Sequence, residues 1–206
     1  KGGVCLNYMK VNCLLKDAAG KINGVHAVDT LDGKEYQIKS KVVVNATGVF
    51  VDDVMKMDEC DTRRKVRPSQ GVHLVVDSKF LGGRSALMIP KTKDGRVLFG
   101  VPWHGKVVLG TTDTPLNEAS LEPRALEEEV DFILDQAGQY LDRKPTRADV
   151  LSIFAGLRPL GAPTHADAKK TKEISRNHKI YRSKSGLLTI TGGKWTTYRA
   201  MAEDVI

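Results

Sequence analysis

A histidine and two arginines lie on predicted strands in positions that would suit an anionic substrate. His73 alternates with apolar residues, so its side chain points away from the apolar face of its strand. Arg158 shares a strand face with Phe154 and Gly156, and the glycine leaves vacant volume beside the guanidinium. Arg176 lies between apolar residues on its own face. A histidine can take the proton of a hydroxyl group, and a planar guanidinium suits phosphate or carboxylate. The residues alone also allow plain structural roles: a packed strand histidine and an arginine that reaches solvent.

A second group of residues surrounds two glycines near the end of the sequence. The apolar run 187–191 is typical of a buried strand, and a helical pattern starts at residue 197. The turn that joins the strand to the helix, with the first helical residue, contains Gly192, Gly193, Lys194, Thr196 and Thr197. Such a turn presents amides and hydroxyl groups at a helix N-terminus, where the helix dipole favours electron-rich or negative partners. Because paired glycines are common in turns, an ordinary strand-to-helix connection is the alternative.

The elements that must position these residues begin with hairpins. β-Prone stretches at 4–15, 22–31 and 35–38, separated by turn residues, predict a β-meander. The apolar run 41–48 then ends in small residues, which predicts a strand buried on both faces of a parallel sheet. The topology therefore changes here from hairpins to an α/β pattern.

The middle of the sequence has the pattern of a larger antiparallel sheet. Its predicted strands are 71–77, 86–90, 96–102, 107–111, 151–158 and 172–182. One helix interrupts them, because apolar residues recur at helical spacing from 126 to 141. Acidic residues of its first turns, among them Glu127, Glu128 and Glu129, are interpreted as a solvated helix face.

Composition restricts the function further. The formal net charge is +7, but 32 basic residues are scattered among 25 acidic ones and no nucleic-acid-binding motif accompanies them, so an anionic small molecule explains a basic pocket better than nucleic acid does. The 3 cysteines have no paired metal-type spacing, which predicts reduced thiols and no metal site. No apolar run reaches the roughly 20 residues that a membrane-spanning helix needs.

Four sequence blocks resemble, in the family's order, the signatures of FAD-dependent glycerol-3-phosphate dehydrogenases. They are Asn45-Ala46-Thr47-Gly48, Gly110-Thr111-Thr112-Asp113, Gly156-Leu157-Arg158-Pro159-Leu160 and the stretch from Gly192 to Arg199. The resemblance implies an α+β fold with an antiparallel-sheet substrate-binding domain at 66–185. A discontinuous remnant of an FAD-binding α/β, Rossmann-like domain is implied at 1–65 and 186–206.

The resemblance also implies roles for single residues. His73 falls where the family carries its active-site histidine, and Arg158 and Arg176 match its two substrate-site arginines. His73 would take the substrate proton, Arg158 would polarise the oxygen that becomes the ketone, and Arg176 would anchor phosphate, although which of His73 and Arg158 handles the proton stays open. Lys194 would lie between flavin and substrate. Cofactor contacts are implied for Ala46, Thr47, Gly48, Gly192, Gly193, Lys194, Thr196 and Thr197.

The implied reaction oxidises sn-glycerol 3-phosphate to dihydroxyacetone phosphate, with hydride transfer to FAD and electrons passing on to a quinone or another acceptor. A G-x-G-x-x-G turn, which holds the FAD diphosphate in the family, does not occur in the sequence. We therefore expect an internal piece of a longer enzyme, without the N-terminal dinucleotide-binding motif and the C-terminal domain, that alone is inactive and does not retain FAD.

Two other functions and several properties stay open. Another flavin oxidoreductase of the same fold could act on an amino acid or hydroxy acid, with arginine binding carboxylate, and a non-catalytic binding module would carry no flavin. We expect a cytoplasmic location, or one at the inner face of the cytoplasmic membrane, or the inner mitochondrial membrane in a eukaryote. The residues do not decide between quinone and oxygen as acceptor, nor do they fix peripheral membrane contact or the oligomeric state.

Overall fold

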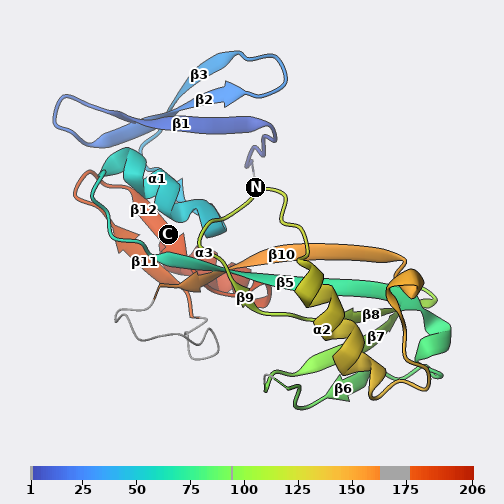
Figure 1. Ribbon diagram of the computed structural model, residues 1–206. Coiled ribbons are helices and arrows are strands. Elements are labelled where there is room, and N and C mark those ends of the chain that lie inside the picture. The colour runs from blue at the N-terminus through green and yellow to red at the C-terminus, as the bar shows by residue number, and fades with distance from the viewer. Residues whose placement is uncertain (1, 94, 163–176) are drawn as a thin grey trace. The chain divides into compact units, whose positions relative to one another are not determined.

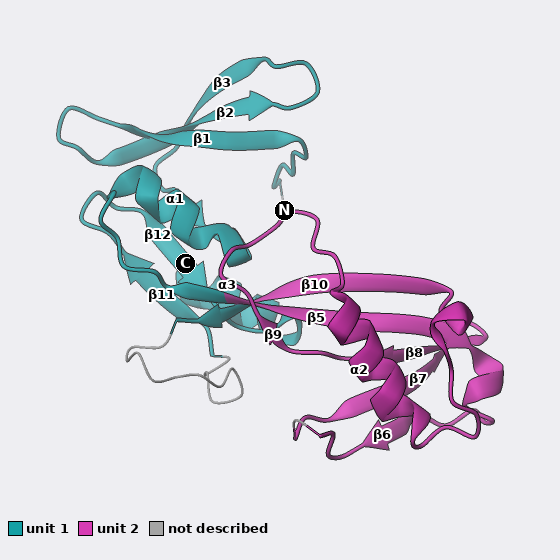
Figure 2. Cartoon of the chain, in the orientation of Figure 1, with its two compact units in different colours: residues 1–67, 159–206 teal, residues 68–158 magenta. Residues whose placement is uncertain are grey.

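The chain forms two compact units, shown as a ribbon in Figure 1 and coloured by unit in Figure 2. This computed structural model describes residues 2–93, 95–162 and 177–206. Unit 1 is built from Lys1–Arg67 and Pro159–Ile206, and unit 2 is the middle of the chain, Pro68–Arg158. The sequence analysis placed the second boundary at residue 185, whereas unit 2 ends at Arg158.

The predicted β-meander is confirmed in unit 1. Strands β1 (Met9–Lys16), β2 (Ile22–Asp29) and β3 (Glu35–Lys39) form a three-stranded sheet in that order, with antiparallel pairing throughout. Gly33 adopts a φ of 75° in the turn before β3, a conformation that an L side chain would strain. The first strand starts at Met9, not at residue 4.

A second three-stranded sheet in unit 1 has the order β11-β12-β4. Strand β12 (Leu188–Thr191) is its buried centre, as predicted, and pairs antiparallel with β11 (Lys179–Arg182) and parallel with β4 (Val44–Asn45). The expectation for residues 41–48 is confirmed in its parallel pairing but not in its burial: β4 lies at the sheet edge, and Val44 is 45% exposed. Of the strand predicted at 172–182, β11 is the described part, and it belongs to this sheet and not to the larger one.

Two α-helices, each preceded by a short 3₁₀ turn, belong to the described part of unit 1. Helix α3 (Tyr198–Val205) follows a short 3₁₀ turn, Trp195–Thr197, close to the predicted start at residue 197. Helix α1 (Val51–Asp58), preceded by a second 3₁₀ turn at Gly48–Phe50, was not predicted. Asp52 and Asp53 in the first turn of α1 suit the positive end of its dipole.

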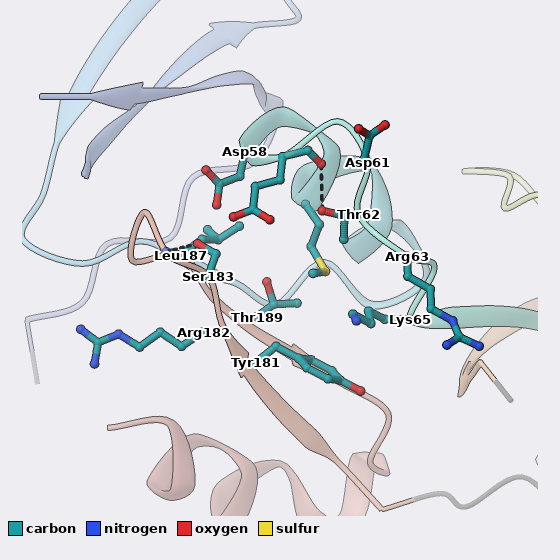
Figure 3. A pocket seen from close by; sticks show the side chains of 12 residues that line it. Asp58, Asp61, Thr62, Arg63, Lys65, Tyr181, Arg182, Ser183, Leu187 and Thr189 are labelled. Carbon is teal, nitrogen blue, oxygen red and sulfur yellow. Dashed lines mark hydrogen bonds between the residues drawn. The ribbon is translucent and has the colours of Figure 1, made fainter. Parts of the chain in front are cut away.

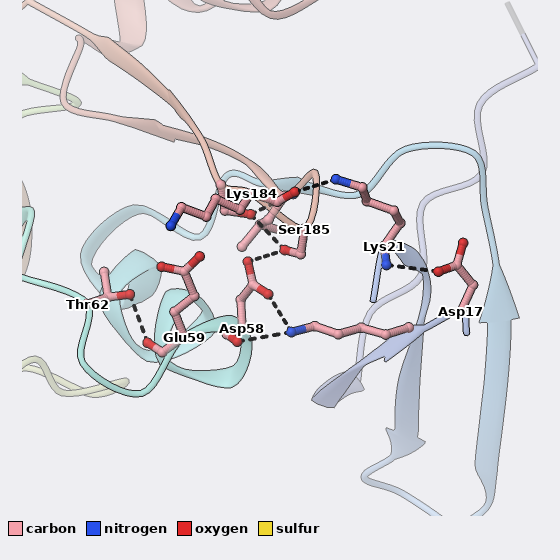
Figure 4. Close-up of polar contacts among 10 residues, drawn as sticks. Asp17, Lys21, Asp58, Glu59, Thr62, Lys184 and Ser185 are labelled. Atoms are coloured by element: carbon pink, nitrogen blue, oxygen red, sulfur yellow. Dashed lines mark hydrogen bonds and ion pairs between the residues drawn. The ribbon is translucent and has the colours of Figure 1, made fainter. Parts of the chain in front are cut away.

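Asp58, the last residue of α1, connects the elements of unit 1 (Figure 4). Its carboxylate lies 2.8 Å from Lys16 Nζ on β1 and accepts a hydrogen bond from Ser185, in the turn between β11 and β12. Burial would raise the pKa of Asp58, but the hydrogen bonds from Lys16, Ser183 and Ser185 outweigh it and hold that pKa below its usual value. Lys21 Nζ also donates to the Lys184 carbonyl at 2.7 Å, and the Ile22 amide donates to the Ser185 carbonyl at 2.9 Å, so the meander is attached to the same turn twice.

Unit 2 is a six-stranded sheet with a helix on one face. The strand order is β10-β5-β8-β7-β6, with β9 paired to β5. The strands are β5 (Val66–Asp77), β6 (Leu87–Ile89), β7 (Leu98–Trp103), β8 (Lys106–Gly110), β9 (Thr114–Pro115) and β10 (Ser152–Gly161). Helix α2 (Glu127–Gly138) confirms the predicted helix and buries its apolar residues against the sheet, in a core that includes Val72, Leu74, Val76, Leu109, Val130, Ile133 and Ala137.

The two faces of this sheet differ in composition. Val72, Leu74 and Val76 are fully buried towards α2, so His73, between them on β5, points to the opposite face as predicted. That opposite face also carries exposed apolar side chains of β7 and β10, including Phe99, Trp103 and Phe154. One expectation for α2 was wrong: Glu129 is not part of a solvated face but is 4% exposed.

Candidate active site

His73 lies half-buried on the open face of the sheet in unit 2. Its imidazole stacks on the ring of Phe154 from β10, with ring centroids 5.0 Å apart and an interplanar angle of 11°. Behind it, Gly110 leaves the space that the ring needs, since a Cβ there would come within 2.5 Å of His73 Cδ2. Burial, and next the positive charge of Arg158, lower the pKa of His73 below its usual value. The imidazole is therefore held in its neutral form, which can accept a proton.

Arg158 is positioned on the same face by groups from two segments, β5 and the stretch that follows β8. Its Nη2 donates a hydrogen bond to Thr111 Oγ1 at 2.8 Å, and its Nη1 lies 3.5 Å from Asp113 Oδ1. Asp113 in turn accepts a short hydrogen bond from Ser69 on β5. The guanidinium rests over Gly71, where a Cβ would come within 2.3 Å of Nη2. With its side chain 27% exposed, Arg158 is anchored yet reaches solvent, where an anion could bind.

The structure thus brings together His73 and Arg158, the two predicted catalytic residues. Arg176 lies outside the described residues. The sequence analysis did not assign roles to Phe154, Gly71 or Asp113, although strand alternation already placed Phe154 on the face of Arg158. The glycine expected to leave room for Arg158 was Gly156; a Cβ there would meet open space, and the glycine under the guanidinium is Gly71.

The predicted cofactor residues gather at one edge of a sheet in unit 1. Because β4 and β12 are parallel, with Asn45 opposite Thr189, their carboxyl ends meet at the same edge. Ala46, Thr47 and Gly48 follow β4, and the pair Gly192 and Gly193 follows β12. The carboxyl edge of parallel strands is where open α/β sheets bind their ligands.

Both loops have backbone conformations that favour glycine, and both expose polar side chains. Gly48, Gly192 and Gly193 have φ values of 62°, 72° and 79°, which favour glycine. Thr47 Oγ1 donates to Asn45 Oδ1 at 2.8 Å, and Thr197 Oγ1 donates to the Lys194 carbonyl at 3.0 Å. Lys194, Thr196 and Thr197 are all exposed. These residues fit a cofactor such as FAD, whose phosphates and ring need donors and close backbone approach.

Two of the hollows in the described residues bear on these sites. One in unit 1, about 330 Å³, is lined by α1, the following loop and the β11–β12 hairpin (Figure 3), and none of the predicted site residues is among its lining residues. The other, about 360 Å³, lies beside the stacked ring of Phe154, with Val75, Trp103 and Val108 in its wall.

In residues 2–93, 95–162 and 177–206, no cluster of histidine, cysteine or carboxylate side chains could hold a metal ion. The helices of these same ranges include none with the length and apolarity needed to cross a membrane.

Comparison with known proteins gives a consistent result. The chain is 47% identical to a mitochondrial glycerol-3-phosphate dehydrogenase of Arabidopsis thaliana and 46% identical to that of Bos taurus, each match covering 100% of this chain but only 32% and 29% of the relative. The X-ray structure of the glycerol-3-phosphate dehydrogenase from Bacillus halodurans, complexed with FAD, superposes with a TM-score of 0.83 at 40% identity. That match covers 97% of this chain and 37% of the other.

The chain therefore spans about a third of the length of the relatives it matches. A family model described as FAD dependent oxidoreductase matches residues 1–199, nearly the whole sequence. The chain belongs to the FAD dependent oxidoreductase family.

Proposed function

We propose that this chain works within a longer FAD-dependent glycerol-3-phosphate dehydrogenase, as its substrate-binding region and one edge of its flavin site. The observation that carries the proposal is the pairing of a neutral, half-buried His73 with an anchored Arg158 on one sheet face. A base beside a fixed cation suits oxidation of an alcohol on an anionic substrate. The identity to glycerol-3-phosphate dehydrogenases over the whole chain supports that substrate in particular.

In the proposed mechanism, His73 takes the proton of the secondary hydroxyl group of glycerol 3-phosphate. At the same time a hydride leaves the carbon that bears this hydroxyl group. FAD, when bound, supplies the acceptor for that hydride. Arg158 stabilises the negative charge that develops on the oxygen, which becomes the ketone of dihydroxyacetone phosphate. The lowered pKa of His73 supports its role as the base, and a guanidinium stays protonated and so suits the polarising role.

Arg176 and Lys194 are the other two residues for which the family resemblance implies a substrate role. Arg176 would bind the phosphate through its forked donors, a role that rests on the family resemblance. Lys194 would hold negative charge between substrate and flavin, and its exposed position directly after Gly193 supports this. Replacing Arg176 with alanine in the full-length enzyme should lower kcat/KM for glycerol 3-phosphate by about 10- to 100-fold while FAD stays bound.

The flavin-binding role is proposed for the two loops at the carboxyl edge of β4 and β12. Ala46, Thr47 and Gly48 come from one loop, and Gly192, Gly193, Lys194, Thr196 and Thr197 from the other. Their convergence from distant parts of the sequence supports a common ligand.

For the electron acceptor we propose a quinone, and for the location peripheral contact with a membrane. The relatives from Arabidopsis thaliana and Bos taurus are named as mitochondrial, which supports the inner mitochondrial membrane for a eukaryotic source and the inner face of the cytoplasmic membrane for a bacterial one. Reduction of a soluble quinone in the absence of oxygen tests this acceptor, and hydrogen peroxide formation in air would favour oxygen instead.

Anaerobic flavin reduction by a panel of substrates tests the proposed reaction. The full-length enzyme is mixed with glycerol 3-phosphate, glycerol, glycine, proline or lactate, and bleaching of the flavin absorbance is followed. Glycerol 3-phosphate should reduce the flavin at least about 100-fold faster than glycerol, because only the phosphate can pair with a guanidinium. Faster reduction by an amino acid or lactate would assign the chain to an amino-acid or hydroxy-acid oxidoreductase.

A further inference from the structure

We infer that Glu129 is a positioning residue for Arg158, acting through the segment from Thr111 to Thr114. The inference rests on the function proposed above. Glu129 belongs to the first turn of α2, where acidic side chains usually face solvent, yet it is buried inside unit 2. A buried carboxylate is costly unless it is fully hydrogen-bonded, so its surroundings indicate what it does.

The carboxylate of Glu129 accepts hydrogen bonds from several elements of unit 2. Its Oε1 accepts from Thr112 Oγ1 at 2.9 Å and from Thr114 Oγ1 at 2.5 Å. Its Oε2 accepts from Gln70 Nε2 at 2.6 Å and from the Leu126 amide at 2.9 Å. These donors belong to β5, to the segment that follows β8, and to the start of α2. One anion therefore fixes three elements to one another, through bonds that its charge strengthens.

The segment after β8 alternates in what it binds. Thr112 and Thr114 face Glu129, whereas Thr111 and Asp113 face Arg158. Both groups that anchor the guanidinium are thus carried by a stretch whose other side is held by the carboxylate. Any shift of that stretch changes the place of Arg158.

A second connection runs to the strand of the catalytic histidine. Thr112 Oγ1, which donates to Glu129, accepts a hydrogen bond from the Val72 amide at 3.0 Å. Val72 immediately precedes His73 on β5. Glu129 is therefore connected to both residues of the proposed active site through Thr112 and its neighbours.

A double-mutant cycle in the full-length enzyme tests the inference. Glu129→Gln keeps the shape but removes the charge and turns an amide group towards two donors. The rate of anaerobic flavin reduction by glycerol 3-phosphate is measured with Glu129→Gln, Arg158→Lys and the double variant. We expect Glu129→Gln to lower the rate about 10-fold in the parent but less than about 2-fold in the Arg158→Lys variant. Lysine has no forked guanidinium whose position Glu129 could fix. Thr112→Val should behave in the same way, and Thr112→Ser should restore most of what Thr112→Val loses.

The outcomes separate the inference from the proposed function. If Glu129→Gln lowered the rate of flavin reduction by the same factor in the parent and in the Arg158→Lys variant, Glu129 would act on stability alone. This result would overturn the inference but not the proposed function. A parent enzyme whose flavin is not reduced by glycerol 3-phosphate, or an Arg158→Lys variant with parental rates, would overturn the proposed site and the inference with it. Glu128→Gln, an exposed carboxylate of the same helical turn, is the matched control and should leave the rate unchanged. If Glu129→Gln does not fold, the cycle with Thr112→Val decides.

Discussion

The guanidinium of Arg158 lies over Gly71, on the strand next to its own, in space that no other residue type would leave. A Cβ on residue 71 would come within 2.3 Å of Nη2 and 2.6 Å of Cζ of Arg158. The two strands, β10 and β5, are neighbours in the sheet, so this relationship fixes the site across the sheet rather than along one strand. It also provides a direct test of how much the place of Arg158 matters.

Gly71→Ala should displace Arg158 while leaving the fold intact. The added methyl meets the far end of a flexible side chain, which can move aside at little cost to stability. We expect flavin reduction by glycerol 3-phosphate to fall about 10- to 100-fold, with thermal stability and FAD content close to the parent. Gly156→Ala is the matched control, because its methyl would enter open space. Equal effects of the two substitutions would contradict this account.

His73→Gln should slow the chemical step itself. Glutamine removes the proton acceptor but fills similar space beside Phe154. Loss of a general base typically costs about 100-fold or more, so rapid-mixing measurement of flavin reduction should show that decrease with flavin still bound. His26→Gln on the meander serves as control and should have no such effect. Parental reduction rates in His73→Gln would exclude His73 as the base.

The acid limb of the pH profile should report the pKa of His73. Burial and the charge of Arg158 both disfavour the imidazolium, so flavin reduction should fall with acidification only below the usual pKa of about 6.5. Removing that charge in Arg158→Gln takes away one of the two causes, and the limb should move to higher pH. Rates of flavin reduction between about pH 5 and 8 measure the acid limb of the parent and that of Arg158→Gln. A limb that moved to lower pH in the variant would contradict this electrostatic coupling.

Some of this site could be predicted from the sequence, because strand alternation is a local property. It placed His73 opposite the core residues of β5 and put Phe154 on the face of Arg158. The contact between Arg158 and Gly71 depends on the register between two strands, which no single strand encodes. Burial of Glu129 likewise depends on donors far away in sequence, such as Gln70.

The difference between local and long-range information also explains where the prediction of the fold was wrong. The apolar composition of 41–48 suggested a central strand, but the sheet order leaves β4 at an edge. Strand β11 pairs with β12 in unit 1, although its composition alone fits either sheet. Helix α1 is only 8 residues long, too short for periodicity to distinguish it from a loop.

Asp58→Asn should destabilise the chain at neutral pH and much less in acid. The carboxylate is nearly inaccessible and pairs with Lys16, so a neutral amide there should lower the thermal midpoint by about 5 °C or more at pH 7. Because the folded pKa of Asp58 is depressed, its contribution is present above the unfolded pKa of about 3.9 and is lost as pH falls through the folded value. Thermal unfolding from about pH 3 to 7 should show the two curves converge in acid. Asp61→Asn, an exposed neighbour, should match the parent throughout.

The chain of 206 residues, expressed alone, should fold without retaining FAD. Both units have buried cores, and the loops after β4 and β12 supply one edge of a flavin site. The sequence has no G-x-G-x-x-G turn, so the amides and helix dipole that hold a dinucleotide diphosphate are lacking, and the cost of ordering the cofactor is not offset. The purified chain should be colourless, and added FAD should keep its free fluorescence at micromolar concentrations. Copurification of stoichiometric flavin would show that Gly192 to Thr197 and the β4 loop bind it far more strongly than two exposed loops should.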